Sequence, residues 1–371
     1  MNRALRGTRA SGTALAHVQG QLDKLGKGFG FDAQATTIRD AFDAIFHRSL
    51  DFPLGARPAA PSRLNEDGSP IQFATAVGAD VPGLRFVGDV GPVGDFGADR
   101  SLAARKAIGD LAGIIGVRRE LDEIMELLDV FAPQDDPILH RDPAGAFWIG
   151  LAFAPGIAPR LRLYINGSWG EESRQWNRVA EFAARAGQAR AWDRVQMQLP
   201  TALKPLGLAV TLASGEPPLG TVYLRAFGVR TSDYAHVAET AAGPPVAAAI
   251  RKFAMALLGD DAAYPTPAAV MSFGLGPLHS AAPTSETAGP LSAELEICGH
   301  CLYRDDTEAH SRLMSAIAEM GLDPRAYLTL AGALTQDPLS PGPPRVHSFV
   351  GVDTKSPAPA LTVYMKPDLY T

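Results

Sequence analysis

The sequence has few features of a secreted, membrane-bound or nucleic-acid-binding protein. It holds two cysteines in 371 residues, which excludes a framework of several disulfides and suits a reducing compartment. The formal net charge is -6, so the basic balance that a nucleic-acid partner requires is absent. The N-terminal segment lacks the apolar run of a signal peptide, and no later run reaches the roughly 18 apolar residues of a membrane helix. We therefore expect a cytoplasmic protein whose partners are neither nucleic acids nor membranes.

The chain does have enough apolar material for a large core. Hydrophobic residues make up 46% and charged residues 20% of the chain, as is typical of a globular protein. The 30 prolines and 37 glycines lie between periodic segments, as expected where turns join many short elements. Length alone is compatible with one large domain or with two.

Two short strands followed by one or two helices recur along the chain. The second strands of successive pairs lie roughly 60 to 77 residues apart, which indicates an internal repeat. Strand pairs are predicted at 71–77 with 84–90, 145–153 with 160–169, 206–214 with 221–229, 268–276 with 293–303, and 345–353 with 361–367. Helices are predicted at 101–131 with Ser101 as N-cap, 171–187, 232–242, 244–259 and 306–321, with a second short helix after the last.

This order of elements predicts an α+β fold. Because hairpins place antiparallel strands side by side and helices follow each pair, the economical architecture is a closed ten-stranded antiparallel barrel surrounded by helices. About eight strands would leave an interior just filled by side chains, whereas ten leave room for a ligand. We expect a single domain over residues 1–371, with an N-terminal helical portion over residues 1–60 packed on it.

The second strands share a polar face. The stretch RLRLYINGSW, residues 160–169, alternates polar and apolar side chains strictly, so its two faces differ. If the polar faces converge inside a barrel, arginines and a lysine surround the lumen with tyrosines between them. The set is Arg85, Asp89, Arg162, Tyr164, Asn166, Thr221, Tyr223, Arg225, Glu294, Glu296, Thr362, Tyr364 and Lys366. Such a ring suits a polyphosphate, while a solvated outer face of an open sheet is the alternative that periodicity leaves open.

The motifs LRLYING, TVYLRAFG and LTVYMKP, with the upstream LNEDGSPIQFATAVG and LRFVGDV, resemble the dimethylallyltryptophan synthase family of aromatic prenyltransferases. The resemblance is greatest to shorter bacterial members and runs from about Leu64 to Pro367. It implies a PT barrel of five αββα repeats with the active site in the lumen. It also implies that dimethylallyl diphosphate is the co-substrate, that no cofactor or metal is required, and that an aromatic ring, usually indole, attacks the allyl cation.

The resemblance assigns roles to matching residues. Arg85 matches the first diphosphate-binding arginine, and Arg162 stands where a basic residue precedes the shielding Tyr164 by two positions. Tyr223 and Tyr364 match tyrosines of the third and last repeats, and the hydroxyl of Tyr364 is also expected at the diphosphate. These roles are physically coherent, since cationic groups stabilise a departing anion and tyrosine faces shield a cation from water.

Several positions depart from the family pattern. Gln72 replaces a glutamate that accepts a hydrogen bond from the indole N–H; its amide oxygen can accept that bond but is not expected to act as a general base. Thr221 stands where a lysine is usual, and Arg225 on the same face is the candidate to compensate. Glu294 and Glu296 replace a neutral diphosphate ligand, so one of them is a candidate to bind a substrate ammonium or take the ring proton. An exposed strand edge is the alternative for both.

Other motifs indicate no further chemistry. CGHC at residues 298–301 resembles a dithiol motif, but it lies in a strand-like run instead of at a helix N-terminus, and a zinc site would lack its second ligand pair. DDTEAH is explained by Asp305 or Asp306 as a helix cap, so we expect no metal. His347, on a first strand, is a candidate to face the lumen and bind substrate, with a structural role as the alternative.

We predict an aromatic prenyltransferase that transfers a dimethylallyl group to an indole-containing acceptor such as tryptophan or a compound derived from it. Arg85, Arg162 and Arg225 would hold the diphosphate. Tyr164, Tyr223 and Tyr364 would shield the cation, and Gln72 would orient the acceptor. Two alternatives stay open: prenylation of a phenol, made plausible by Gln72, and a non-catalytic barrel that binds an apolar or phosphorylated ligand, made plausible by Thr221 and the two glutamates. The oligomeric state is left open.

Overall fold

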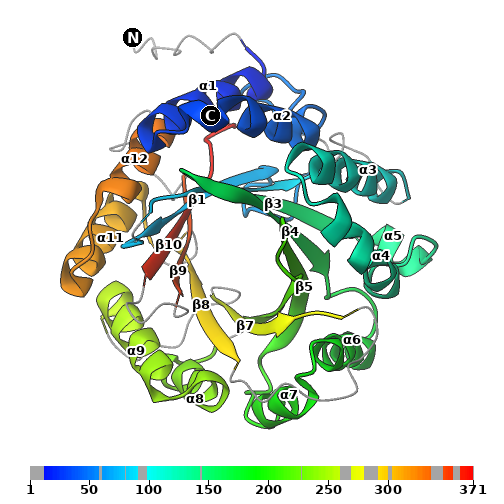
Figure 1. The fold of residues 1–371 in the computed structure, drawn as a ribbon. Coiled ribbons are helices and arrows are strands. Elements are labelled where there is room, and N and C mark those ends of the chain that lie inside the picture. The colour runs from blue at the N-terminus through cyan, green and yellow to red at the C-terminus, as the bar shows by residue number, and fades with distance from the viewer. Residues whose placement is uncertain are drawn as a thin grey trace, which may run out of the picture.

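In the computed structural model, ten strands of the described residues close into one antiparallel barrel, with helices around it (Figure 1). The strand order is β1-β10-β9-β8-β7-β6-β5-β4-β3-β2, so neighbours in sequence are neighbours in space and β1 closes on β10. This confirms the predicted barrel. The structure describes residues 12–57, 61–79, 81–90, 98–142, 144–226, 228–259, 269–279, 291–299, 303–335, 346–353 and 360–370.

The strands form hairpins at the predicted positions. They are β1 (Ile71–Val77) with β2 (Leu84–Asp89), β3 (Phe147–Ala154) with β4 (Ile157–Asn166), β5 (Lys204–Ala213) with β6 (Leu219–Ala226), β7 (Ala269–Pro277) with β8 (Ser292–Cys298), and β9 (His347–Asp353) with β10 (Ala360–Met365). Strand ends differ by two or three residues in β4 and β6, and the largest error is in β8, which does not continue to Tyr303. The strand ends at Cys298, and the Tyr303 amide donates to the Gly299 carbonyl at 3.0 Å, which is helical geometry. His300 and Cys301 lie outside the described residues.

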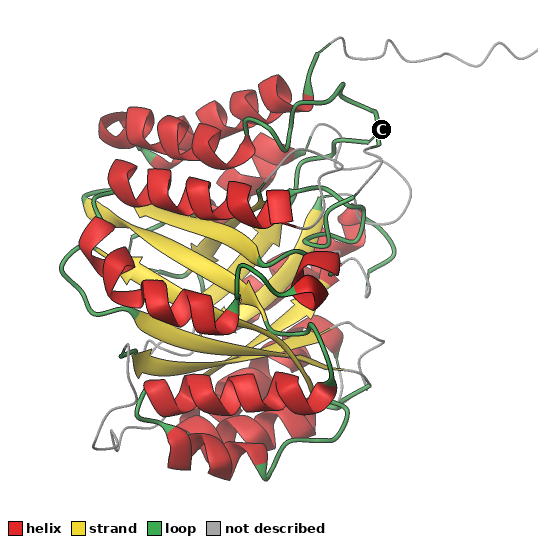
Figure 2. Ribbon diagram, turned by 90° about the vertical axis from the view of Figure 1, so that its right-hand side faces the viewer, coloured by secondary structure: helices red, strands yellow, loops and turns green. Residues whose placement is uncertain are grey.

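Helices follow the hairpins and cover the barrel's outer face (Figure 2). They are α1 (Ala14–Phe29), the short 3₁₀ helix η1 (Asp32–Gln34), α2 (Ala35–Phe46), α3 (Ala98–Ile114), α4 (Arg118–Phe131), α5 (Pro137–Arg141), α6 (Glu172–Arg185), α7 (Ala189–Gln196), α8 (Thr231–Ala242), α9 (Pro244–Leu258), α11 (Asp306–Met320) and α12 (Arg325–Leu334). None of the helices in the described ranges is long and apolar enough to cross a membrane.

Helix ends differ from the prediction at several points. The predicted helix over 101–131 is two helices, because Gly116 between them has a φ of 75°. Ser101 is not an N-cap, since α3 already begins at Ala98 and encloses it. Helix α7 was not predicted; it has 8 residues, too few to show a clear helical period. Asp305 caps α11 as predicted, and its carboxylate accepts a hydrogen bond from the Glu308 amide at 2.8 Å.

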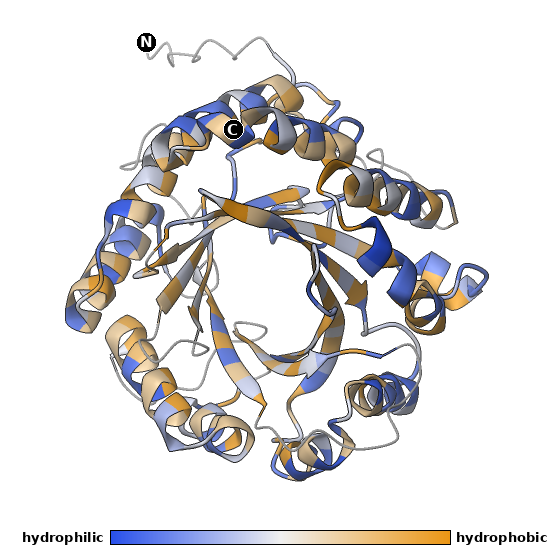
Figure 3. Cartoon of the chain, viewed as in Figure 1, coloured by the Kyte–Doolittle hydropathy of each residue, from blue (hydrophilic) through white to orange (hydrophobic). Residues whose placement is uncertain are grey.

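The apolar face of each strand packs against the helices. In β4, Leu161 and Leu163 are buried in the hydrophobic core, and Figure 3 shows hydrophobic residues alternating with paler or blue ones along the strands. Under α2, an aromatic cluster joins helix to barrel, with ring centroids of Phe86 lying 6.0 Å from those of both Phe42 and Phe46. This layer fixes the outer wall and turns the other face of each strand inward.

Gly88 on the outer face of β2 lies where α2 approaches the barrel most closely. An added Cβ would lie 2.2 Å from the Phe46 ring and 2.9 Å from Ile45. We predict that Gly88→Ala lowers the free energy of unfolding by about 1–3 kcal/mol, because overpacking forces the helix to shift. Urea denaturation monitored by circular dichroism measures the change.

Gly20 in α1 provides a matched control. An added Cβ there meets nothing within 4 Å, and alanine is favoured over glycine inside a helix by about 0.5–1 kcal/mol. Gly20→Ala should therefore leave stability unchanged or slightly increased. Equal stabilities of Gly88→Ala and the wild type would mean that α2 does not pack on β2 as described.

Candidate active site

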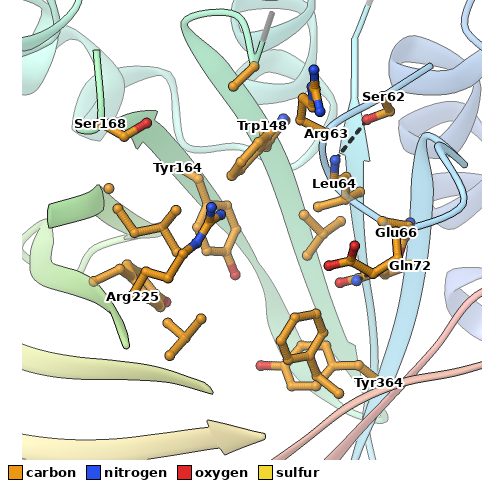
Figure 4. A pocket seen from close by; sticks show the side chains of 18 of the residues that line it. Ser62, Arg63, Leu64, Glu66, Gln72, Trp148, Tyr164, Ser168, Arg225 and Tyr364 are labelled. Atoms are coloured by element: carbon orange, nitrogen blue, oxygen red, sulfur yellow. Dashed lines mark hydrogen bonds between the residues drawn. The ribbon is translucent and has the colours of Figure 1, made fainter. Parts of the chain in front are cut away.

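A cavity of about 690 Å³ lies inside the barrel, and all ten strands contribute to its lining. Loop residues that precede β1, among them 61–68, complete the lining at one end, which we call the mouth. The contributing strand residues include Gln72, Val87, Trp148, Tyr164, Gly207, Tyr223, Val270, Glu296, Phe349 and Tyr364. In Figure 4, Tyr164 and Arg225 lie on one side of the cavity, with Gln72 and Glu66 opposite.

Glycines on the lumen face let large side chains lie flat against the wall. Gly150 pairs with Arg162 in the register of β3 and β4, and an added Cβ there would lie 3.1 Å from the Tyr164 ring. Gly351 pairs with Glu296, and its Cβ would lie 3.0 Å from Cγ of that glutamate. Larger residues at these two positions would crowd both side chains.

Arg162 is half-buried and lies between two tyrosines. Its Nη2 donates hydrogen bonds to the Tyr223 hydroxyl at 2.5 Å and to Thr221 Oγ1 at 3.0 Å. Its guanidinium carbon lies 5.5 Å from the Tyr164 ring centroid and 5.6 Å from that of Tyr223, which is cation–π geometry. The buried Nε has no hydrogen-bond partner among the described residues. A cation that is partly removed from water is suited to bind an anion.

Burial keeps the three lumen tyrosines neutral. Desolvation raises the pKa of Tyr164, and it raises the pKa of Tyr223 and Tyr364 well above the ordinary value. The rings of Tyr164 and Tyr223 lie 5.7 Å apart between centroids. These residues therefore present hydroxyl donors and π faces to the lumen, without negative charge.

Glu296 lines the cavity, so the exposed-edge alternative does not hold for it. The Tyr364 hydroxyl donates to its Oε1 at 2.7 Å. Burial raises the Glu296 pKa to about 7, Glu294 raises it as well, and the Tyr364 hydrogen bond, Arg162 and Arg85 act in the opposite direction. The carboxyl group can thus gain or lose a proton near neutral pH.

Arg85 lies on the lumen face of β2, in register with Ala74, and neither Arg85 nor Arg162 is among the residues that line the cavity itself. Arg85 is two residues further from the mouth than Val87, which does line it. Its charge acts on the pKa of Tyr164, Glu296 and Tyr364. The structure therefore brings Arg85 and Arg162 to the same deep group of tyrosines and glutamates.

Arg225 lies closer to the mouth. Arg225 is two residues after Tyr223 on β6, towards the mouth. Thr221, which accepts a hydrogen bond from Arg162, is two residues before Tyr223, away from the mouth. Burial lowers the pKa of Arg225, and the nearby Glu66 raises it. Arg225 thus lines the cavity, but it lies nearer the mouth than Thr221 and does not occupy the place of the lysine that is usual at position 221. Glu66 was missed by the sequence reasoning, although it lies in the quoted LNEDG stretch.

Other polar residues of the predicted ring bind the loops at the mouth instead of facing the cavity. Lys366 Nζ contacts Asp67 Oδ2 at 2.6 Å, and Asn166 Nδ2 donates to the Gly145 carbonyl at 2.9 Å. Asp89 forms an ion pair with Arg100. These residues shape the rim of the barrel, so the lysine predicted for the ring is engaged by a carboxylate.

The expectation that His347 faces the lumen was wrong. Its Nδ1 lies 2.7 Å from Asp306 Oδ1 and its Nε2 lies 3.0 Å from the Tyr327 hydroxyl, both in the helix layer. The register of β9 and β10 shifts beside it, between Tyr364 and Met365. Such a bulge breaks the alternation, so a residue with lumen parity turns outward. His347 has a structural role that ties α11 and α12 to the barrel.

No family model and no curated protein matches the chain in sequence. Among solved structures, 6-dimethylallyltryptophan synthase from Micromonospora olivasterospora, in complex with DMASPP and Trp, matches with a TM-score of 0.83 and 22% identity over 96% of this chain and 98% of that one. The 5-dimethylallyl tryptophan synthase from Streptomyces coelicolor matches with a TM-score of 0.79 and 25% identity over 97% of both chains. AnaPT from Neosartorya fischeri matches at 0.66 and 16%, over 95% and 92%.

These likenesses confirm the resemblance at the level of the fold: the chain is a PT barrel of the type found in dimethylallyltryptophan synthases. The lumen face carries half-buried arginines, neutral tyrosines and a titratable carboxylate. Within the described residues, no group of three or more histidines, cysteines, aspartates and glutamates is arranged to hold a metal ion.

The hydrogen bond between Tyr364 and Glu296 yields a direct prediction. Because this bond stabilises the ionised carboxylate, Tyr364→Phe should raise the Glu296 pKa above about 7. Infrared difference titration against a Glu296→Gln background isolates the signal. Tyr370→Phe is the control, since that hydroxyl donates to the Gly68 carbonyl at 3.2 Å. An unchanged or lower Glu296 pKa in Tyr364→Phe would exclude the interaction.

Proposed function

We propose that this protein is an aromatic prenyltransferase that transfers a dimethylallyl group from dimethylallyl diphosphate to an indole-containing acceptor, such as tryptophan or a compound derived from it. The observation that carries the proposal is the half-buried Arg162, held between Tyr164 and Tyr223 with its Nε unpartnered among the described residues. An anion site walled by tyrosine rings suits the separation of a diphosphate from an allyl cation. The neighbouring folds support it, because two of them hold DMASPP and Trp.

Arg85 and Arg162 would stabilise the leaving group. The C–O bond of the co-substrate breaks and both electrons leave with the diphosphate, so negative charge grows where the two guanidinium groups act. The rings of Tyr164, Tyr223 and Tyr364 would shield the allyl cation from water until the acceptor attacks. In this proposal the arginines supply the positive charge that the reaction needs, and no metal ion or cofactor is required.

The acceptor would lie between this deep site and the mouth. Gln72 would accept a hydrogen bond from the ring N–H, and the opposed charges of Arg225 and Glu66 would suit the carboxylate and ammonium of an amino acid. We thereby reassign Arg225 from the diphosphate to the acceptor. After a carbon–carbon bond forms, the proton on the attacked ring carbon would pass to ionised Glu296.

The test is product analysis. The protein is incubated in EDTA with dimethylallyl diphosphate and, separately, tryptophan, a tryptophan dipeptide and tyrosine, and products are examined by mass spectrometry. We expect tryptophan or the dipeptide to gain one dimethylallyl group in place of a proton. Prenylation of tyrosine alone would favour the phenol alternative. No product from any acceptor would support the non-catalytic barrel.

The pH dependence tests Glu296 as the proton acceptor. Below about pH 7 the carboxyl group is protonated and cannot take the ring proton, so kcat/KM should rise with pH through about 7. Glu296→Gln should lower kcat and remove this limb. Glu294→Gln removes a charge that raises the Glu296 pKa, so it should shift the limb to lower pH. If kcat/KM of Glu296→Gln still rises with pH through about 7, the limb belongs to another titrating group.

A further inference from the structure

The side-chain amide of Gln72 is held by two buried neighbours. Its Nε2 donates to Asn65 Oδ1 at 2.6 Å and to Ser348 Oγ at 2.8 Å. The side chains are buried: Gln72 and Asn65 are each 6% exposed, and Ser348 is 4% exposed. Both protons of the Gln72 amide are therefore used on the wall of the cavity.

The orientation of this amide follows from the partners of Asn65. Asn65 Nδ2 donates to the backbone carbonyls of Ser69 at 2.9 Å and Ile71 at 3.0 Å. Because carbonyl oxygens accept and never donate, the NH₂ group of Asn65 must face them, and its oxygen must face Gln72. Gln72 in turn must present its NH₂ group to Asn65.

Ser348 completes the arrangement. Its hydroxyl donates to Asn65 Oδ1 at 3.2 Å and accepts from Gln72. Gln72 Oε1 has no hydrogen-bond partner in the part of the chain that the structure describes, and Gln72 lines the cavity. The one polar atom of this side chain left for a ligand is thus an acceptor.

We propose that Asn65 is a positioning residue that locks Gln72 as a hydrogen-bond acceptor, so that the site selects aromatic acceptors with an N–H donor at this point. The inference rests on the proposed function and deepens it. It also explains why glutamine fits here, since a carboxylate at position 72 would place an oxygen against Asn65 Oδ1. Without Asn65, the Gln72 amide can rotate and present its NH₂ group to the substrate.

The test compares tryptophan with its benzothiophene analogue, in which sulfur replaces the ring N–H. Asn65→Leu should lower kcat/KM for tryptophan by about tenfold or more, and change that for the analogue by less than about threefold. Ser348→Ala, which removes one partner of Gln72, should have an intermediate effect. A merely structural defect would lower kcat/KM equally for both substrates, and this result would overturn the inference.

A double-mutant cycle shows whether Asn65 acts through Gln72. Gln72→Leu should produce the same loss of selectivity, and adding Asn65→Leu should then change little, because the residue that it orients is gone. Fully additive effects of the two substitutions would overturn the inference. Circular dichroism and the melting temperature of each variant report folding separately.

A further measurement separates this inference from the proposed function. If the wild type prenylates neither substrate, the proposed function fails, and the amide is then examined by NMR with ¹⁵N-glutamine labelling. The wild type should show two distinct, slowly exchanging Nε2 protons for Gln72, assigned by their absence in Gln72→Leu, and Asn65→Leu should lose this protection. An amide that exchanges rapidly in the wild type would overturn the locked orientation.

Discussion

The rest of the site depends on how the positive charge of the half-buried Arg162 is stabilised. A guanidinium removed from water is unfavourable unless other groups replace its hydration. Two tyrosine rings, the Tyr223 hydroxyl and Thr221 supply part of this replacement. The closed barrel makes it possible, because side chains from separate hairpins meet only when the sheet returns on itself. A bound anion would replace a further part of this hydration.

The departures from the family pattern lie in the same lumen and act on the same charge balance. Glu294 and Glu296 bring negative charge close to Arg85 and Arg162, and burial leaves Glu296 with a pKa of about 7. On β1, Gln72 is neutral and cannot take a proton. In the proposed reaction the proton acceptor is therefore Glu296 on β8, and Gln72 on β1 is only the hydrogen-bond partner of the acceptor. This chain shares its fold with solved structures at 22% and 25% sequence identity. Such low identity is compatible with one fold, because the outer wall of the barrel requires only apolar packing and the lumen requires only a few polar positions.

Most of the barrel could be predicted because strict alternation fixes which side chains share a face. The inward direction of Arg162, Tyr164 and Tyr223 followed from that rule together with closure of the sheet. His347 broke the rule at a bulge, which no pattern in the sequence indicated. Glu66 and Asn65 lie in a loop, where side-chain direction depends on tertiary contacts instead of a period.

The central claim is that Arg162 holds the leaving diphosphate in the lumen. Calorimetric titration with dimethylallyl thiolodiphosphate tests it most directly, using Arg162→Ala and, as the matched control, Arg160→Ala on the same strand, whose guanidinium pairs with Glu216 at 3.0 Å at the surface. We predict that Arg162→Ala weakens binding by roughly 10- to 150-fold, because this is the affinity that hydrogen bonds to a charged group contribute. Arg160→Ala should bind the analogue as tightly as the wild type does. Equal affinity of Arg162→Ala and the wild type would contradict the central claim.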